Sequence, residues 1–101
     1  MAIKGVADVN QDGFPDLIVL EDLRPEIYLN DGKGKFTKLA GAFRGMEKAT
    51  PSSMASWGLA VMTDFDNDGV PDLLWNGRYF LWVLRGLGEG RVRRRLRHGR
   101  R

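Results

Sequence analysis

Short apolar runs, separated by polar and glycine-rich turns, make up most of the 101-residue chain. Apolar and polar positions alternate within the runs with a period of two, and no segment has a helical stripe longer than two turns, so the pattern is typical of β-strands. The expected strands are residues 3–9, 16–20, 26–29 and 35–39, followed by 57–63, 72–75, 79–85 and 90–94. The sequence therefore predicts an all-β fold with four strands in each half.

Glycine-containing turns order the strands within each half. The stretch NDGKGK at 30–35 places Asn and Gly where a hairpin needs positive φ, and LGEGR at 87–91 keeps both glycines at equivalent positions. The third and fourth strands of each half should therefore form a hairpin. Residues 40–56 are small, polar and weakly patterned, as expected of a connection between sheets. The core is expected to come from Leu17, Ile18, Val19, Ile27, Leu29, Phe36 and their counterparts in the second half.

The two halves are copies of one pattern. DVNQDGFPD at 8–16 matches DFDNDGVPD at 64–72, and the offset of 56 residues continues without a gap to Gly34 and Gly90. A chain of this length is one small domain at most, and periods near 50 occur in propeller arrays. The predicted organisation is a first repeat at 1–56, a second, incomplete repeat at 57–93, and an arginine-rich tail at 94–101 that we expect to be disordered.

The charge of the chain is unevenly distributed. The formal net charge is +3, but seven of the sixteen basic residues are arginines at or after position 91, so residues 1–90 carry nine basic and thirteen acidic side chains. The tail could be a basic arm for nucleic acid, yet it has no aromatic residues for stacking bases, so a solvated end is the simpler interpretation. The chain has no cysteine, no apolar run of membrane-spanning length and no signal-peptide pattern at its start.

The two acidic loops have the alternation of oxygen ligands and spacer residues that hard cations such as calcium prefer. Side chains at loop positions 1, 3, 5 and 9, with the backbone carbonyl of position 7, would supply the oxygens. In the first loop these ligands are Asp8, Asn10, Asp12, Phe14 (carbonyl) and Asp16. In the second loop they are Asp64, Asp66, Asp68, Val70 (carbonyl) and Asp72. The sequence therefore predicts two calcium sites.

Glycine and proline shape the predicted ion loops. Gly13 and Gly69 at position 6 allow the positive φ that turns the chain back around an ion, and the following prolines restrict the residue that precedes them. An EF-hand is excluded because position 12, where it needs a bidentate glutamate, is Val19 or Trp75. Two alternatives remain: magnesium, which prefers to keep its waters, and a pair of turns whose acidic side chains only face water.

The sequence resembles the FG-GAP or VCBS-type repeats, whose best-known members form the seven-bladed propeller of integrin alpha subunits. The resemblance is carried by DVNQDGFPDLIV, IYLNDGKGKFT and WGLAVMTDFDNDGVPDLL, and covers nearly all of residues 3–92. It implies two four-stranded antiparallel β-propeller blades, a partial propeller, with a calcium loop between the first and second strand of each blade. It also implies secretion or surface display.

The leading functional hypothesis is a non-catalytic, calcium-stabilised scaffold for extracellular adhesion or ligand recognition. The alternative is the accessory propeller of a secreted enzyme, such as one that acts on polysaccharides, and Trp75, Tyr79 and Trp82 could then stack on sugars if they are not core residues. Catalysis within the chain is not expected, because His98 lies in the tail, cysteine is absent, and Ser52, Ser53 and Ser56 have no base nearby in the sequence.

Two blades would not close a propeller by themselves. Propellers close with about four to eight blades, so each outer face should need a partner. We therefore expect further blades, either from the same longer chain or from a homo-oligomer, and an extracellular protein or carbohydrate ligand that the sequence does not identify. Nucleic acid is not an expected partner.

Overall fold

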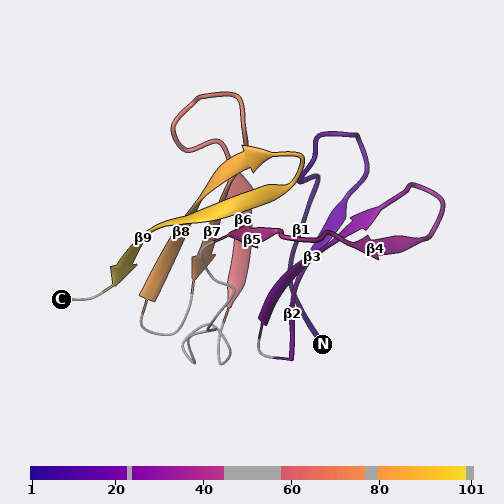
Figure 1. Cartoon of the computed structure of the whole chain (residues 1–101), viewed down its shortest axis with the longest axis horizontal. Helices are drawn as coiled ribbons and strands as arrows, with labels where there is room; N and C mark the ends of the chain where they lie inside the picture. The colour runs from indigo at the N-terminus through magenta and orange to yellow at the C-terminus, as the bar shows by residue number, and fades with distance from the viewer. Residues whose placement is uncertain (23, 45–57, 77–79, 100–101) are drawn as a thin grey trace.

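Two β-sheets form the described part of the chain, which in this computed structural model comprises residues 1–22, 24–44, 58–76 and 80–99. The first sheet has the order β1 (Ala2–Ala7), β2 (Asp16–Glu21), β3 (Arg24–Asn30) and β4 (Phe36–Lys38). The second has the order β5 (Phe43–Arg44), β9 (Arg91–Gly99), β8 (Phe80–Gly88), β7 (Asp72–Asn76) and β6 (Leu59–Thr63). Figure 1 shows the two sheets side by side. The described residues contain no helix, and so none long and apolar enough to cross a membrane.

The strand registers repeat with the same offset as the sequence. In the first sheet Ala7 pairs with Asp16 and Ile18 with Ile27, and in the second Thr63 pairs with Asp72 and Leu74 with Val83. Each acidic stretch therefore becomes the loop between the first and second strand of an antiparallel four-stranded unit. The predicted all-β fold and its two four-stranded units are confirmed. The predicted strand starts at 57 and 79 lie outside the described residues.

The core lies between the two sheets and is built from one face of each. The first sheet contributes Ile18, Leu20 and Ile27, and the second contributes Leu73, Trp75, Trp82 and Leu84. Where β1 lies against β6, a Cβ on Gly5 would collide with the backbone of Ala60. Trp75 and Trp82 are fully buried, so of the alternatives considered for them the core assignment is correct, while Tyr79 lies outside the described residues.

Phe36 was expected in the core, but its side chain is 41% exposed. It begins the short edge strand β4, whose three residues are all exposed. An edge strand has a neighbour on one side only, so its side chains are covered less well than those of the central strands. Leu17 and Leu29 are half-buried, whereas Ile18, Val19 and Ile27 are buried as predicted.

The second sheet also contains strand structure that the sequence pattern did not indicate. Strand β5 lies in the expected connection and pairs in parallel with β9, Phe43 opposite Val92. Strand β9 runs to Gly99, so residues 94–99 are paired with β8, contrary to the expected disordered tail. Strand pairing uses backbone groups, which a run of arginines supplies as well as any other sequence. The long β8–β9 hairpin in Figure 1 reaches toward the loop between β1 and β2.

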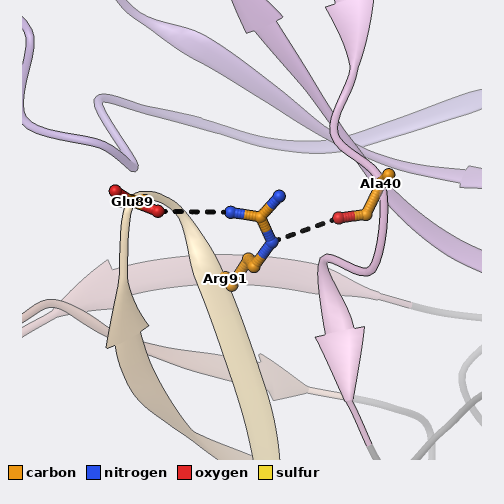
Figure 2. Close-up of polar contacts among 3 residues, drawn as sticks. All are labelled: Ala40, Glu89 and Arg91. Carbon is orange, nitrogen blue, oxygen red and sulfur yellow. Dashed lines mark hydrogen bonds and ion pairs between the residues drawn. The ribbon is translucent and has the colours of Figure 1, made fainter.

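The turn of this hairpin is joined to the connection between the sheets. The Arg91 Nε donates a hydrogen bond to the Ala40 carbonyl at 3.2 Å, and its Nη1 lies 3.4 Å from a Glu89 carboxylate oxygen, as Figure 2 shows. On the inner side of the turn, a Cβ on Gly90 would press against Val9 and Leu39 of the first half. Arg91, the first arginine of the C-terminal run, therefore contacts both halves of the chain.

We predict that Gly86→Ala destabilises the fold by about 2–3 kcal/mol, since a Cβ at this position would overlap the Pro71 carbonyl and the Val70 side chain. In the first half the equivalent residue is Asn30, whose Nδ2 donates to the Pro15 carbonyl at 2.9 Å. The matched variant Asn30→Ala removes two exposed hydrogen bonds, this one and the one that the Asn30 Oδ1 accepts from the Gly32 amide at 2.8 Å, and should cost about 1–2 kcal/mol. Urea unfolding of both variants tests the difference, and equal losses would contradict it.

Candidate metal centre

The first acidic loop is folded around its own carboxylates. The Asp8 carboxylate accepts hydrogen bonds from the amides of Asp12 at 3.1 Å and Gly13 at 2.7 Å. Asp12 in turn accepts from the amide of Phe14 at 3.0 Å. These contacts curl residues 8–14 so that the side chains at loop positions 1 and 5 face the inside of the turn.

The second loop repeats the same contacts. The Asp64 carboxylate accepts from the amides of Asp68 at 3.1 Å and Gly69 at 2.7 Å, and Asp68 accepts from Val70 at 2.9 Å. Two loops offset by 56 positions thus reach one hydrogen-bonding pattern from sequences that differ at loop positions 2, 3, 4 and 7. The common pattern follows from the shared aspartates and glycine, not from the spacer residues.

A buried aspartate closes each loop. Asp16, at the start of β2, is fully buried and accepts from the amides of Val9 at 2.9 Å and Asn30 at 2.8 Å. Asp72, at the start of β7, is 2% exposed and accepts from Phe65 at 3.1 Å and Gly86 at 2.7 Å. Each of these carboxylates therefore joins the entrance of its loop to the end of the third strand.

Three carboxylates converge in each loop. One oxygen from each of Asp8, Asp12 and Asp16 lies within 4.8 Å of the others, and the same holds for Asp64, Asp66 and Asp72. Two oxygens bound to one calcium ion at about 2.3–2.6 Å lie at most about 5 Å apart, so both groups meet this limit. An ionised carboxylate has about four lone-pair sites, so the amide contacts leave acceptor capacity free.

Asn10 gives an independent indication that the first loop suits a cation. Its Oδ1 is buried, and no hydrogen-bond donor among the described residues reaches it. A buried amide oxygen without a partner costs about 1–3 kcal/mol, and a cation held at loop position 3 would satisfy it. The donor set of the first loop therefore fits a hard, oxygen-seeking cation.

The pKa values of the loop carboxylates are shifted in different directions. Burial works against ionisation of Asp8 and Asp64, yet the amides of Gly13 and Gly69 donate to them and hold the pKa of each below its usual value. Burial raises the pKa of Asp16, and its two amide donors offset this only in part. Desolvation, followed by the neighbouring Asp68 and Asp72 carboxylates, raises the pKa of Asp66. Each loop thus contains a carboxyl group whose ionisation a nearby cation would favour.

The outcome for the predicted ligands differs between positions. The structure brings together the predicted carboxylates at positions 1, 5 and 9 of the first loop and at positions 1, 3 and 9 of the second. Asp68 is outside the second group, although it accepts from the Val70 amide as Asp12, a member of the first group, accepts from the Phe14 amide. Ligation by the carbonyls of Phe14 and Val70 stays a prediction.

The predicted loop glycines have the required backbone conformation, with φ of 92° at Gly13 and 89° at Gly69. Each loop has a second left-handed position that the sequence did not predict, where φ is 60° at Gln11 and 62° at Asn67. The amide contacts of Asn30 and Gly86, which lie 14 residues after the buried aspartates, were not predicted either. The repeat held a signal for these contacts, because Asp72 and Gly86 lie 56 residues after Asp16 and Asn30.

The chain is all-β, and each of its two sheets has an acidic loop between its first and second strands. This arrangement is that of a partial β-propeller built from two blades. Residues 8–75 match the FG-GAP-like repeat, and the chain belongs to this family. The predicted family is therefore confirmed.

A known human protein also resembles the chain. Integrin alpha-7 of Homo sapiens is 32% identical over an alignment 101 positions long, which covers 82% of this chain and 8% of that protein. The chain thus spans about 8% of the length of this relative. No solved structure matches the chain.

We predict that Gln11→Asn stabilises the fold by roughly 0.5 kcal/mol, because asparagine tolerates the left-handed conformation better than glutamine does. The reverse change in the second loop, Asn67→Gln, should destabilise by a similar amount. Thermal unfolding of both variants in the presence of a chelator measures the backbone effect without a metal contribution. A lower melting temperature for Gln11→Asn would contradict the argument.

Proposed function

We propose that the chain is a calcium-binding, non-catalytic β-propeller segment that holds one ion in each acidic loop. The observation that carries the proposal is the first loop, which combines three converging carboxylate oxygens with the buried, unpartnered Oδ1 of Asn10. The ligands would be Asp8, Asn10, Asp12 and Asp16 in one loop and Asp64, Asp66, Asp68 and Asp72 in the other, with the carbonyls of Phe14 and Val70.

The role of the ions on this proposal is structural. Each loop connects the first strand of a blade to the second, and its carboxylates lie close enough to repel one another when ionised. A divalent cation would remove this repulsion and hold the ends of β1 and β2, or of β6 and β7, in one geometry. The carboxylates would then be committed to the metal and would not serve as acid or base.

The setting we propose is extracellular adhesion or ligand recognition, supported by the family and by the likeness to an integrin alpha chain. Calcium is abundant outside cells, where sites of about 10⁻⁴–10⁻³ M affinity are filled. The alternative function, an accessory propeller of a secreted enzyme, had drawn on tryptophans that could stack on sugars. Trp75 and Trp82 are buried and offer no ring face to a sugar. Ser52, Ser53 and Ser56 lie outside the described residues.

Calcium should stabilise the chain, and a chelator should reverse the effect. An ion bound only by the folded state adds about 2.7 kcal/mol per site at a free concentration about 100-fold above Kd. Calorimetry should give two ions per chain, and Asp12→Ala or Asp68→Ala should each remove one. Lys33→Glu, on the exposed β3–β4 turn, is the control and should bind two. A melting temperature that does not respond to millimolar calcium after chelation would refute the proposal.

The second loop should bind calcium more tightly than the first. It offers four carboxylates where the first offers three, because Asp66 stands at the position of Asn10, and ligand charge raises affinity. Calorimetry on Asp12→Ala, which leaves the second site, and on Asp68→Ala, which leaves the first, ranks them. Asn10→Asp should raise the calcium affinity of the first loop and so reduce the difference in affinity between the two loops. The opposite order of affinities would mean that rigidity, not charge, sets the ranking.

A further inference from the structure

Three arginines from adjacent strands form a row across the outer part of the second sheet. Arg93 on β9 pairs directly with Arg44 on β5 and with Arg85 on β8. Partners in adjacent strands lie about 5 Å apart, so the three positions span about 10 Å across the sheet. We call Arg44, Arg85 and Arg93 the arginine row. The basic segment at the C-terminal end of the sequence therefore begins on an ordered surface.

The arginine row points to solvent. Its sequence neighbours Phe43, Leu84 and Val92 belong to the core between the sheets, and side chains alternate along a strand, so the row lies on the opposite face. All three arginines are exposed, and none has a hydrogen bond or an ion pair among the residues that the structure describes. Their N–H donors are therefore free for a ligand.

The arginine row works against the stability of the sheet. Like charges directly opposite each other in adjacent strands repel, and here two such pairs share one residue, Arg93. In the first sheet the places of Arg85 and Arg93 are taken by Leu29 and Thr37, which are uncharged. Local arrangements that oppose stability are expected at functional sites. The row is therefore a candidate binding surface.

A cavity of about 520 Å³ adjoins the row at the β8–β9 turn. It is lined by Arg44, by exposed Leu87 and Glu89 of the turn, and by Arg91, which lies two positions before Arg93 and so on the same face of β9. Arg91 gives its Nε to the Ala40 carbonyl and contacts the 88% exposed Glu89 side chain only at 3.4 Å (Figure 2). A guanidinium group has five donors, so Arg91 can bind a further anion.

The outer strands of a sheet stay open beside a packed neighbour. Thr37 is the counterpart of Arg93, and its partner Leu29 packs against the core, so Thr37 lies on the side of the first sheet that faces the second. Thr37 is nevertheless exposed. Arg93, and Arg44 still nearer the edge, would therefore remain accessible even with another sheet packed on the inner strands.

The chemistry of this surface favours a polymer with repeated strong anionic groups. Guanidinium groups bind planar or tetrahedral oxyanions through paired hydrogen bonds, and evenly spaced cations match evenly spaced anions. Among the side chains that the structure describes on β5, β8 and β9, no aromatic one is exposed. Stacking platforms for bases and aromatic anchors for a protein partner are therefore missing from this part of the surface.

We propose that Arg44, Arg91 and Arg93, flanked by Arg85, bind a sulfated polysaccharide. Its sulfate groups would lie along the arginine row, and a sugar ring would fill the adjoining cavity. The Glu89 carboxylate lines the same cavity and would weaken the binding of a polyanion. The inference takes its extracellular setting from the proposed function and adds the class of ligand, but it does not depend on calcium in either loop.

The test is titration calorimetry of the full chain with heparin of one length, and with desulfated heparin and duplex DNA as comparison polymers. We expect binding that requires sulfate and weakens as salt is raised, because counterions are released on binding. Arg44→Glu and Arg93→Glu should each weaken it about 10-fold or more, and Glu89→Gln should strengthen it. Arg100→Glu, the same charge change in the same basic run but outside the described residues, is the control and should lose less than about 3-fold.

Thermal unfolding separates a lost site from a lost fold. Arg93→Glu replaces two repulsive pairs by attractive ones, so its melting temperature should rise while its affinity for heparin falls. The inference is overturned if Arg100→Glu weakens binding as much as Arg93→Glu does, or if desulfated heparin or duplex DNA binds as tightly as heparin.

Calcium calorimetry on the same samples keeps the two proposals apart. A chain that binds calcium but not heparin overturns only the polysaccharide inference. A chain that binds heparin through Arg44 and Arg93 but takes up no calcium supports this inference and overturns only the metal proposal.

Discussion

Each blade depends on one buried carboxylate that accepts two backbone amides from separate parts of the chain. Asp16 joins Val9 at the loop entrance to Asn30 at the end of β3, and Asp72 does the same for Phe65 and Gly86. Hydrogen bonds to a charged group contribute about 1.5–3 kcal/mol each, and loss of the acceptor would leave two amides unsatisfied. The loop and the first three strands are therefore held in register by the residue that also closes the candidate metal centre.

The same contact accounts for a difference between the two blades. The amide that reaches Asp16 belongs to an asparagine, whose side chain also bonds the Pro15 carbonyl, while the amide that reaches Asp72 belongs to a glycine packed directly against Pro71. Proline at position 8 of the loop has no amide hydrogen, and its carbonyl faces the end of the third strand in both blades. Two different residues thus meet one requirement, that the strand end should approach the buried aspartate closely.

The sequence predicted well those features that local chemistry determines. The two-fold repeat, the positive φ of Gly13 and Gly69 and the acidic clusters follow directly from the type and spacing of the loop residues. Pairings between distant segments were not predictable. Strand β5 has two residues and depends on β9 nearly 50 positions away, and β9 continues through arginines because backbone pairing is insensitive to side-chain charge. Gln11 was missed because glutamine rarely adopts the left-handed conformation that the loop imposes.

Burial separates the roles of the acidic residues more clearly than the sequence does. All four aspartates of the second loop are equivalent in the sequence as candidate ligands, yet Asp72 is buried and holds two strand ends, while Asp66 and Asp68 are exposed.

The most direct test of calcium binding in the two loops is a crystal structure grown with calcium, using anomalous scattering to locate the ions. One anomalous peak is expected inside each loop, with carboxylate oxygens of Asp8 and Asp16, or of Asp64 and Asp72, at about 2.3–2.6 Å. Well-ordered loops that contain only water at saturating calcium would contradict it.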